Sequence, residues 1–408
     1  MNIRLRPVDE SEFPSFQRIA SRGFGNHVDS ALIDERQKIV ELDRTIAAYD
    51  GNDIVGTNLS SSLTMNIPGD ALPVAGIAYI SVQPTHRRQG ILTSMMEFQL
   101  KNIHSRQEPL AALYSSESLI YGRFGFGIGT IQESWEIDKR HAQLLKPNTA
   151  SGHVRFVDPN EMRSVFPDIQ KNALSDRPGT IFTPDYEWDS KKNKAEESSA
   201  DQAIPFNILY ESTHGIEGYA TYTNSGFDRR STSSLEVSEL LGTTTAAYTS
   251  LWDFCLGIDL VQKIKAVNQP ADDPLFWQLS EPQKLRRTIY PDLSNALWIR
   301  LVDVKSALAA RKYMTRDKLT LGVVDNFCPW NAGKYELSGT PDGSQCRLVN
   351  SSPDISLSVI DLASVYLGTV KFSTLAQAGR IEEHTYGSIH RADAMFATHS
   401  APFCPFFF

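Results

Sequence analysis

The sequence predicts a multidomain protein of mixed α/β and α+β class. Its 408 residues are more than one hydrophobic core ordinarily organises, so two or three domains are expected. Strand and helix signals alternate over residues 1–150, and a similar strand-helix-strand order returns over residues 151–292. Residues 293–408 show a third pattern, of α+β type. We therefore expect two related α/β domains followed by an α+β domain.

The first block is expected to start with antiparallel strands and to end in a β-α-β unit. A tight turn at Asp50-Gly51-Asn52, between two apolar runs, is typical of a hairpin. The expected strands cover residues 3–7, 44–49, 53–57, 74–82 and 110–114, and the expected helices cover residues 10–21, 30–42 and 92–103.

The second and third blocks lack an evident catalytic cluster. Between Leu235 and Tyr248 stand Gly242 and three threonines but no arginine, so the repeated block has the strand-helix-strand order without a basic turn. The charged residues 190–199 are expected to form a loop. The other expected elements are strands at 154–157, 206–210, 218–222, 235–237, 261–267, 295–302, 319–324 and 333–337, and helices at 244–256, 304–311, 360–367 and from 375 onward.

Composition and charge exclude some classes of function. Hydrophobic residues at 41% and charged residues at 22% are typical of a soluble globular protein. The net charge of −8 argues against a nucleic-acid binder, whose affinity rests on neutralising phosphates. It would suit a cationic substrate, although a mildly acidic surface is the commoner reason for such a charge. No apolar run could span a membrane and the N-terminus does not resemble a secretory signal, so we expect a cytoplasmic protein without membrane attachment.

Cysteines and histidines give no sign of a disulfide framework or a metal site. The four cysteines, Cys255, Cys328, Cys346 and Cys404, include no C-x-x-C pair. The nine histidines include no pair at metal-ligand spacing. We therefore expect reduced thiols and no metal.

The clearest chemical signal is a basic turn between a strand and a helix. The strand that ends at Val82 is followed by Arg87-Arg88-Gln89-Gly90 and then by an apolar-periodic helix. Free backbone N–H groups at the helix start, beside two arginines and a glycine, form a corner that binds phosphate. The turn resembles the R/Q-x-x-G-x-G/A loop of the GNAT N-acetyltransferases, which in that family cradles the pyrophosphate of acetyl-CoA. Leu92 stands where most such sequences have glycine or alanine.

A second signal is Tyr121, which follows the expected strand 110–114 and precedes Gly125-Phe126 by four residues. In a GNAT fold a tyrosine at this spacing points its hydroxyl at the thioester sulfur. Its role would be that of a general acid that protonates the departing thiolate. The alternative is a buried tyrosine whose hydroxyl is satisfied by the protein.

The C-terminus is a third signal, because it ends in three phenylalanines and contains Pro402 and Pro405. Chain ends are usually polar and frayed, so an apolar tail is expected to pack in a crevice or against another subunit. A carboxylate moved from water into apolar surroundings has a raised pKa and becomes a better base near neutral pH. From the residues alone, packing without catalysis is the simpler explanation.

Several motifs together resemble the enhanced-intracellular-survival (Eis) branch of the GNAT superfamily. They are residues 84–92, Ser116-Glu117, residues 120–125, residues 296–304 and residues 325–333, so the resemblance covers nearly the whole chain. It implies an active GNAT domain, a degenerate GNAT domain and a sterol-carrier-protein-like domain, assembled as a homohexamer. It also accounts for Leu92, which this branch tolerates.

The resemblance implies a set of site residues for acetyl-CoA and for acetyl transfer. Backbone groups of the strand end would bind the pantetheine arm, the basic turn the pyrophosphate, and two residues after the next strand would line the channel. In this sequence these positions are Ile80, Ser81 and Val82, then Arg87, Arg88, Gln89, Gly90, Ile91, Leu92 and Thr93, then Ser116 and Glu117. Tyr121 would be the general acid, and the α-carboxylate of Phe408 the general base.

The acceptor is expected to be an amine of a cationic small molecule, such as an aminoglycoside or a polyamine. This family's pocket is acidic, but here Asn26 and His27 stand where an aspartate and an aromatic residue are expected, and Phe407 is apolar. The nearest carboxylates are Asp29, Asp34 and Glu35, which on a helix are more often a solvated face. Two alternatives remain open: acetylation of protein lysines, and a non-catalytic assembly that binds acetyl-CoA or an apolar ligand.

Overall fold

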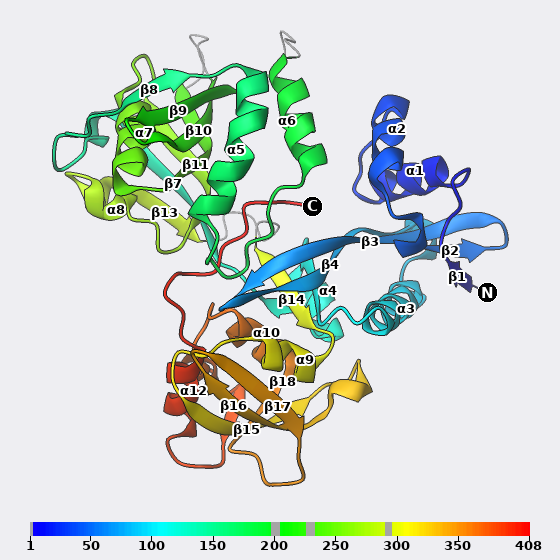
Figure 1. The fold of residues 1–408 in the computed structure, drawn as a ribbon. Helices are drawn as coiled ribbons and strands as arrows, with labels where there is room; N and C mark the ends of the chain where they lie inside the picture. The colour runs from blue at the N-terminus through cyan, green and yellow to red at the C-terminus, as the bar shows by residue number, and fades with distance from the viewer. Residues whose placement is uncertain (1–2, 197–204, 226–232, 290–295) are drawn as a thin grey trace. The chain divides into compact units, whose positions relative to one another are not determined.

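The computed structural model describes residues 3–196, 205–225, 233–289 and 296–408. The chain forms two compact units (Figure 1). The first unit comprises Met1–Thr130, Ala296–Pro402 and Phe407–Phe408, and the second comprises Ile131–Asn295 and Phe403–Phe406. The boundary expected between residues 292 and 293 lies outside the described residues.

The first unit is built on a seven-stranded sheet of order β1-β2-β3-β4-β5-β14-β6. Neighbouring strands are antiparallel except β4 and β5, which run parallel. The strands are β1 (Ile3–Arg6), β2 (Thr45–Asp50), β3 (Asp53–Ile67), β4 (Asp70–Val82), β5 (Leu110–Tyr114), β6 (Gly127–Ile128) and β14 (Leu297–Leu301). Helices α1 (Phe13–Gly23) and α2 (Ser30–Ile39) connect β1 to β2. Helix α3 (Ile91–Ser105) connects β4 to β5, and α4 (Ser118–Tyr121) lies between β5 and β6 in the sequence.

Helices cover both faces of this sheet, because alternate residues of each strand point to opposite faces. On one face, Phe13 and Phe16 of α1 pack with Tyr49 of β2. On the other, Ile91 and Met95 of α3 pack on neighbouring strand residues. Figure 1 shows α1 and α2 on one side of β3 and α3 on the other.

Strand β14 is the main departure from the expected organisation. Residues 295–302 were expected at the start of the third block, but β14 lies between β5 and β6 of the first sheet. Its five residues are all buried, as is usual for a central strand. Residues 131–295, which form most of the second unit, are therefore inserted between two strands of the first sheet.

A buried ion pair links β14 to a distant loop of the same unit. Arg300 and Asp325 are 0% and 1% exposed, and Arg300 Nη2 donates to Asp325 Oδ2 at 2.5 Å. Gly125 lies against the guanidinium, since a Cβ there would come within 2.6 Å of Arg300 Cζ. Asn331 Nδ2 also donates to Asp325 Oδ2, at 3.2 Å. The motifs at residues 296–304 and 325–333 thus meet in one buried network.

The C-terminal part of the first unit is a five-stranded sheet of order β17-β16-β15-β18-β19 with four helices. It is joined closely to the first sheet, because a Cβ on Gly127 of β6 would lie 2.2 Å from the carbonyl oxygen of Ile360 on α10. Its elements are α9 (Val304–Ala310), β15 (Asp317–Val324), β16 (Gly333–Thr340), β17 (Gly343–Leu348), β18 (Ile355–Ser358), α10 (Val359–Tyr366), α11 (Phe372–Gln377), β19 (Ile381–Glu383) and α12 (Ser388–Phe396).

The second unit repeats the architecture of the first sheet, with strand order β8-β9-β10-β11-β12-β7-β13. Its one parallel pair is again the fourth and fifth strands of that order, β11 and β12. Strand β7, which the boundary at residue 150 assigns to the first block, belongs to this sheet. The strands are β7 (Gln132–Asp138), β8 (His153–Phe156), β9 (Phe206–Ser212), β10 (Gly215–Ser225), β11 (Ser234–Gly242), β12 (Lys263–Pro270) and β13 (Arg286–Ile289).

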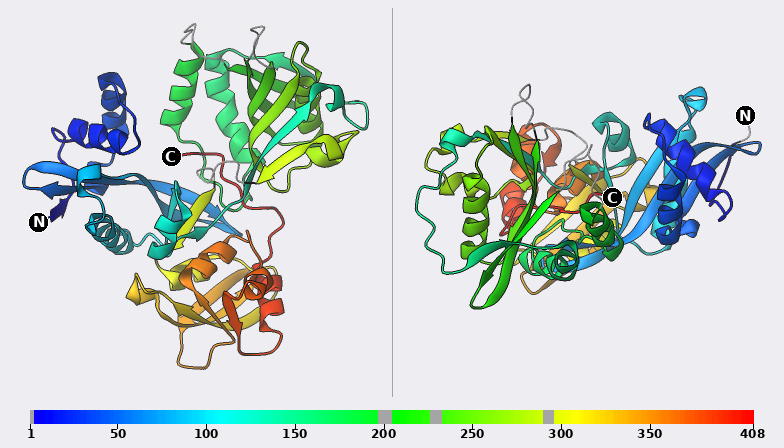
Figure 2. Two further views of the ribbon diagram at one scale, coloured as in Figure 1. Left: turned by 180° about the vertical axis from the view of Figure 1, so that it is seen from behind. Right: turned by 90° about the horizontal axis from the view of Figure 1, so that it is seen from above.

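Helices α5 (Pro159–Ala173) and α6 (Asp185–Glu196) cover one face of this second sheet, and α7 (Thr245–Gly257) covers the other (Figures 1 and 2). Helix α6 corrects the loop expected at residues 190–199, of which 197–199 lie outside the described residues. Its sequence is strongly polar, and the one buried residue is Trp188. A single apolar anchor gives no 3.6-residue periodicity, so the sequence pattern missed the helix.

Residues 375–379 were expected to start a helix, but α11 ends at Gln377, and Gly379 has a φ of 72°. In the described part of the chain, no helix is long and apolar enough to cross a membrane.

Candidate active site

The site is organised by the divergence of β4 and β5. These parallel strands pair only over Val74–Gly76 and Leu110–Ala112. Beyond Gly76, a bulge shifts the register between β3 and β4, and Tyr79 within it has a φ of 54°. The carbonyl of Tyr79 accepts a hydrogen bond from Thr57 Oγ1 at 2.8 Å, which ties down the bulge. Bulges bend a strand and end its pairing, so a gap opens beside the last residues of β4.

A cleft of about 920 Å³ occupies this gap and the start of α3. It brings together eleven of the twelve residues expected to bind acetyl-CoA, together with the expected acid Tyr121. The residues from the expected set that line it are Ile80, Ser81, Val82, Arg87, Arg88, Gly90, Ile91, Leu92, Thr93, Ser116, Glu117 and Tyr121. Gln89 is exposed in the turn and does not line the cleft.

The start of α3 has the geometry of an anion site. Gly90 is the N-cap residue with a φ of 81°, and no side chain caps the first turn. A Cβ at Gly90 would have nothing within 4 Å, so the backbone is open on this side. Arg88 also has a positive φ, of 63°, and Arg87 Nε donates to the carbonyl of Val82 at 3.2 Å. Uncapped N–H groups beside exposed arginines favour a phosphate group.

Tyr121, the last residue of α4, is 7% exposed, and its ring packs edge-on against Phe126 at 6.3 Å between centroids. Burial, reinforced by the negative charge of Glu117, raises the pKa of Tyr121 to about 12. The hydroxyl is therefore protonated at neutral pH. It makes no hydrogen bond to any residue that the structure describes, so its proton is available to a molecule in the cleft.

Ser81 is a buried polar group that faces the cleft. It is 7% exposed, and its Oγ has no hydrogen-bond partner among the described residues. Gly23, at the end of α1, packs directly on it: a Cβ at Gly23 would lie 1.8 Å from Ser81 Oγ. An unpartnered buried hydroxyl costs about 1–3 kcal/mol, which a bound acceptor or water would recover.

Phe408 does not line the cleft, but its ring lies at the point where the two strands part. A Cβ on Gly76 would come within 3.0 Å of Phe408 Cε2, and the rings of Phe408 and Tyr114 are 5.4 Å apart. Phe407 is 63% exposed, with its ring 4.3 Å from that of Tyr114. The C-terminal residue thus belongs to the first unit and contacts both β4 and β5.

The preceding tail residues belong to the second unit and are held through their backbone. Gln132 Nε2 donates to the carbonyl of Cys404 at 2.8 Å, and Thr180 Oγ1 donates to the carbonyl of Phe403 at 3.3 Å. Both side chains are at most 2% exposed. Of the two expected arrangements, a crevice or another subunit, these contacts show packing within the chain itself. No sequence pattern identified the two buried polar residues that bind the tail.

The cleft is also lined by residues that the sequence did not predict for it: Gly23, Phe24, His86, Ile120 and Arg123. Arg123 could have been found, since it lies two residues after Tyr121 in the motif already singled out. With Arg87 and Arg88 it gives the cleft three guanidinium groups against one carboxylate, that of Glu117. This balance suits a polyanionic ligand.

The residues considered for the acceptor side do not line this cleft. Asp29 is the N-cap of α2 and accepts a hydrogen bond from the backbone N of Leu32 at 2.8 Å. Asp34 and Glu35 are exposed on α2. Among the described residues, no group of three or more His, Cys, Asp or Glu side chains could hold a metal ion.

Family models match three parts of the chain. An acetyltransferase (GNAT) domain matches residues 4–129, and a second model of the same description matches residues 179–301. A sterol carrier protein domain matches residues 304–405. The fold and the cleft therefore define an acyltransferase of the GNAT class, whose fold implies acetyl-CoA as co-substrate.

Several N-acetyltransferases are similar to this chain over nearly its full length. An uncharacterized N-acetyltransferase of Streptomyces avermitilis is 35% identical over 99% of both chains. N-acetyltransferase Eis of Mycobacterium tuberculosis is 29% identical over 98% of both. The crystal structure of Eis1 from Mycobacterium abscessus is 30% identical, covers 99% of this chain and 100% of its own, and superposes with a TM-score of 0.86. The chain belongs to the Eis family of GNAT N-acetyltransferases.

Proposed function

We propose that this enzyme transfers the acetyl group of acetyl-CoA directly to an amine of a cationic small molecule, of the aminoglycoside or polyamine kind. The observation that carries the proposal is the buried, protonated hydroxyl of Tyr121 in the same cleft as the basic turn. The net charge of −8 favours a cationic acceptor.

The cleft residues fit acetyl-CoA. Arg88 and the open backbone at Gly90 would hold the pyrophosphate at the start of α3. The end of β4, unpaired on the β5 side, would offer its backbone to the amides of the pantetheine arm, and Ser81 Oγ would gain a partner there. When bound, acetyl-CoA supplies a thioester carbonyl carbon that an amine can attack.

Two residues would move the protons of the reaction. The α-carboxylate of Phe408 would take a proton from the acceptor ammonium, leaving a neutral, nucleophilic amine. Tyr121 would donate its hydroxyl proton to the leaving thiolate. The backbone N–H of Val82 would donate to the carbonyl oxygen as negative charge develops on it. Attack within a ternary complex needs no covalent enzyme intermediate, and one amide bond forms as one thioester bond breaks.

Thiol release from acetyl-CoA, with an aminoglycoside and a polyamine as acceptors, tests the acid. In Tyr121→Phe we expect kcat to fall by about 10²–10⁴-fold, with acetyl-CoA binding retained. Tyr386→Phe is the matched control, because Tyr386 is fully exposed at 100%. Unchanged turnover in Tyr121→Phe would remove this residue from the mechanism.

The base is tested by the chain end itself. Deleting Phe408, or adding a few residues after it so that its carboxylate becomes an amide, should each abolish most turnover. The extension is the sharper variant, because it keeps the ring that contacts Gly76 and Tyr114. Activity that survived the extension would show that another group deprotonates the amine.

We also propose that the enzyme assembles as a homohexamer, as the family resemblance implies. Sedimentation of the purified protein at several concentrations would reveal six copies. A monomer or dimer at all concentrations would contradict the proposal.

A further inference from the structure

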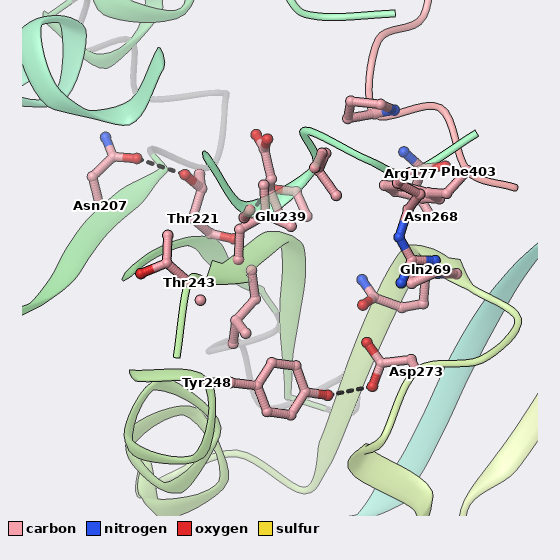
Figure 3. Close-up of a pocket in the computed structure, with 18 of the residues that line it drawn as sticks. Arg177, Asn207, Thr221, Glu239, Thr243, Tyr248, Asn268, Gln269, Asp273 and Phe403 are labelled. Carbon is pink, nitrogen blue, oxygen red and sulfur yellow. Dashed lines mark hydrogen bonds between the residues drawn. The ribbon is translucent and has the colours of Figure 1, made fainter. Parts of the chain in front are cut away.

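The second unit contains a cavity of about 620 Å³ in the place that corresponds to the cleft of the first (Figure 3). Strands β11 and β12 pair in parallel over Ser234–Val237 and Lys263–Ala266 and then diverge. The cavity lies beyond the last paired residues, between the ends of the two strands and the start of α7. It is formed wholly by residues of the second unit.

This cavity is not built for a phosphate. The first turn of α7 is closed by its own side chain, because Thr244 Oγ1 accepts a hydrogen bond from the backbone N of Ala247 at 3.2 Å. Gly242 is packed against the helix, where a Cβ would come within 2.7 Å of the backbone N of Tyr248. The turn of residues 242–245 contains no cation. A coenzyme A pyrophosphate would therefore find a capped first turn and no arginine in the turn that precedes the helix.

One end of the cavity carries hydrogen-bond acceptors that the protein leaves unused. Asp273 is 8% exposed; its Oδ1 accepts from the hydroxyl of Tyr248 and, at 2.9 Å, from the backbone N of Leu275. Its Oδ2 has no partner in the described part of the chain. Gln269 is 3% exposed, and its Nε2 donates to the carbonyl of Val267 at 2.7 Å, which fixes its amide oxygen as the second free acceptor. Figure 3 shows both side chains reaching into the cavity beside Tyr248.

The other charges that face the cavity are paired within the unit or exposed at its rim. Glu239 accepts from the hydroxyl of Tyr219, from Gln170 at 3.0 Å and from Lys191 at 3.0 Å. Two further cations line the wall: Arg177, whose Nη1 bonds Asp272 at 2.7 Å, and Lys194, which is exposed on α6. Asp273 is thus a buried carboxylate that makes no ion-pair contact with a described residue, and Arg177 is the cation whose charge acts on it. Burial raises the pKa of Asp273 to about 6, so it is mostly ionised at pH 7.5.

The remaining wall is largely apolar and would suit the body of a small ligand. Leu174, Leu240 and Leu241 contribute to it, together with Phe403 from the C-terminal tail. A buried acceptor pair at one end of an apolar cavity selects a molecule with an ionised donor at one end and an apolar remainder.

We propose that the second unit is a non-catalytic amine-binding site, which takes a small molecule with a primary ammonium on a short apolar body. The ammonium would lie between Asp273 Oδ2 and the amide oxygen of Gln269. The site acts beyond the acetyl-transfer reaction, because it has no turn for acetyl-CoA and so binds an amine without modifying it.

Isothermal titration of the full-length protein at pH 7.5, in the absence of acetyl-CoA, tests the site. The probes are benzylamine and its neutral isostere benzyl alcohol. We expect saturable binding of the amine, and at least tenfold weaker binding of the alcohol. Asp273→Asn should weaken amine binding at least tenfold. Asp253→Asn, an exposed carboxylate on α7 of the same unit, should leave it unchanged.

Two further measurements keep the result decisive. Gln269→Met removes the second acceptor without adding charge, so it should also weaken amine binding. It provides a second test of the site should Asp273→Asn fold poorly. Acetyl-CoA binding and circular dichroism of each variant report whether the protein is intact. Equal affinity for amine and alcohol, or an unchanged amine affinity in folded Asp273→Asn, would overturn the proposal. Thiol release is measured in a separate assay, so the absence of transferase activity would not affect the interpretation of amine binding.

Discussion

The two units show how one sheet architecture yields two different ligand sites. In each, the fourth and fifth strands of the order run parallel for three or four residues and then diverge, and a helix starts beside the gap. In the first unit the helix start is uncapped at Gly90 and flanked by arginines. In the second, Thr244 caps it and the gap holds unpaired acceptors instead. The sheet provides the space, and the turn beyond the fourth strand decides which ligand enters it.

The largest effect is expected at the buried ion pair of strand β14, which lies between β5 and β6. In Asp325→Asn, the charge of Arg300 stays buried without its partner, which should lower the free energy of unfolding by about 3–5 kcal/mol. Asp342→Asn is the control, since Asp342 and Arg316 are 90% and 79% exposed and 3.9 Å apart, and it should have little effect. Denaturant titration followed by circular dichroism measures both. Equal stability of the two variants would show that the buried pair does not hold β14.

Alanine substitutions at the two turn glycines, Gly90 and Gly242, should affect different properties: ligand binding in the first unit and stability in the second. Gly90→Ala adds a side chain on the open face of the α3 turn at a φ of 81°, so we expect acetyl-CoA to bind about tenfold more weakly. Gly242→Ala forces a Cβ against the backbone of Tyr248, so it should destabilise the second unit by about 1–3 kcal/mol without changing acetyl-CoA affinity. Titration calorimetry and thermal melts separate the two outcomes. A loss of acetyl-CoA affinity in Gly242→Ala would erase the distinction between the turns.

The width of the first cleft can be tested by overpacking and rescue. Gly23→Ala places a methyl group 1.8 Å from Ser81 Oγ, so Ser81 must move into the cleft. We expect a severalfold rise in the KM for acetyl-CoA, and recovery when Ser81→Gly is added, because that change removes the clashing Oγ and Cβ. Steady-state thiol release measures both. If the KM of the double variant stayed raised, the contact between Gly23 and Ser81 would not determine the width of the cleft.

The smallest effect concerns the cap of α7. Thr244→Ala removes the side-chain acceptor for the N–H of Ala247 and should cost about 1 kcal/mol of stability. It should leave acetyl-CoA turnover unchanged, because Thr244 does not line the cleft of the first unit. A thermal melt and a thiol-release assay on one preparation measure both effects. A reduced kcat would contradict the prediction and show that the second unit influences acetyl transfer.

Local patterns in the sequence predicted much of this arrangement. The basic turn, Tyr121 and the helix after the turn are signals within a few residues of one another, and the structure gathers them in one cleft. The repeated β-α-β order predicted the second GNAT-like unit. These features depend on periodicity and turn chemistry, which act over short stretches.

Other features depend on contacts between distant segments and left no local signal. The place of β14 in the first sheet is set by pairing of Leu301 with Leu110, far apart in sequence. The contact of Gly23 with Ser81 and the hydrogen bond from Gln132 to the tail are likewise long-range. The amine site was missed because Asp273 and Gln269 become acceptors without partners only once burial and the neighbouring hydrogen bonds are known.

The insertion of the second unit between β6 and β14 has a consequence for biosynthesis. Strand β5 is complete once residue 114 has been made, but its neighbour β14 begins only at residue 297. Until then β5 presents an open, apolar edge, the kind of edge on which chains aggregate. A nascent chain stopped at residue 290 should therefore be more protease-sensitive over its first 130 residues than over residues 131–290. The N-terminal domain would thus be the first to be translated and among the last to finish folding.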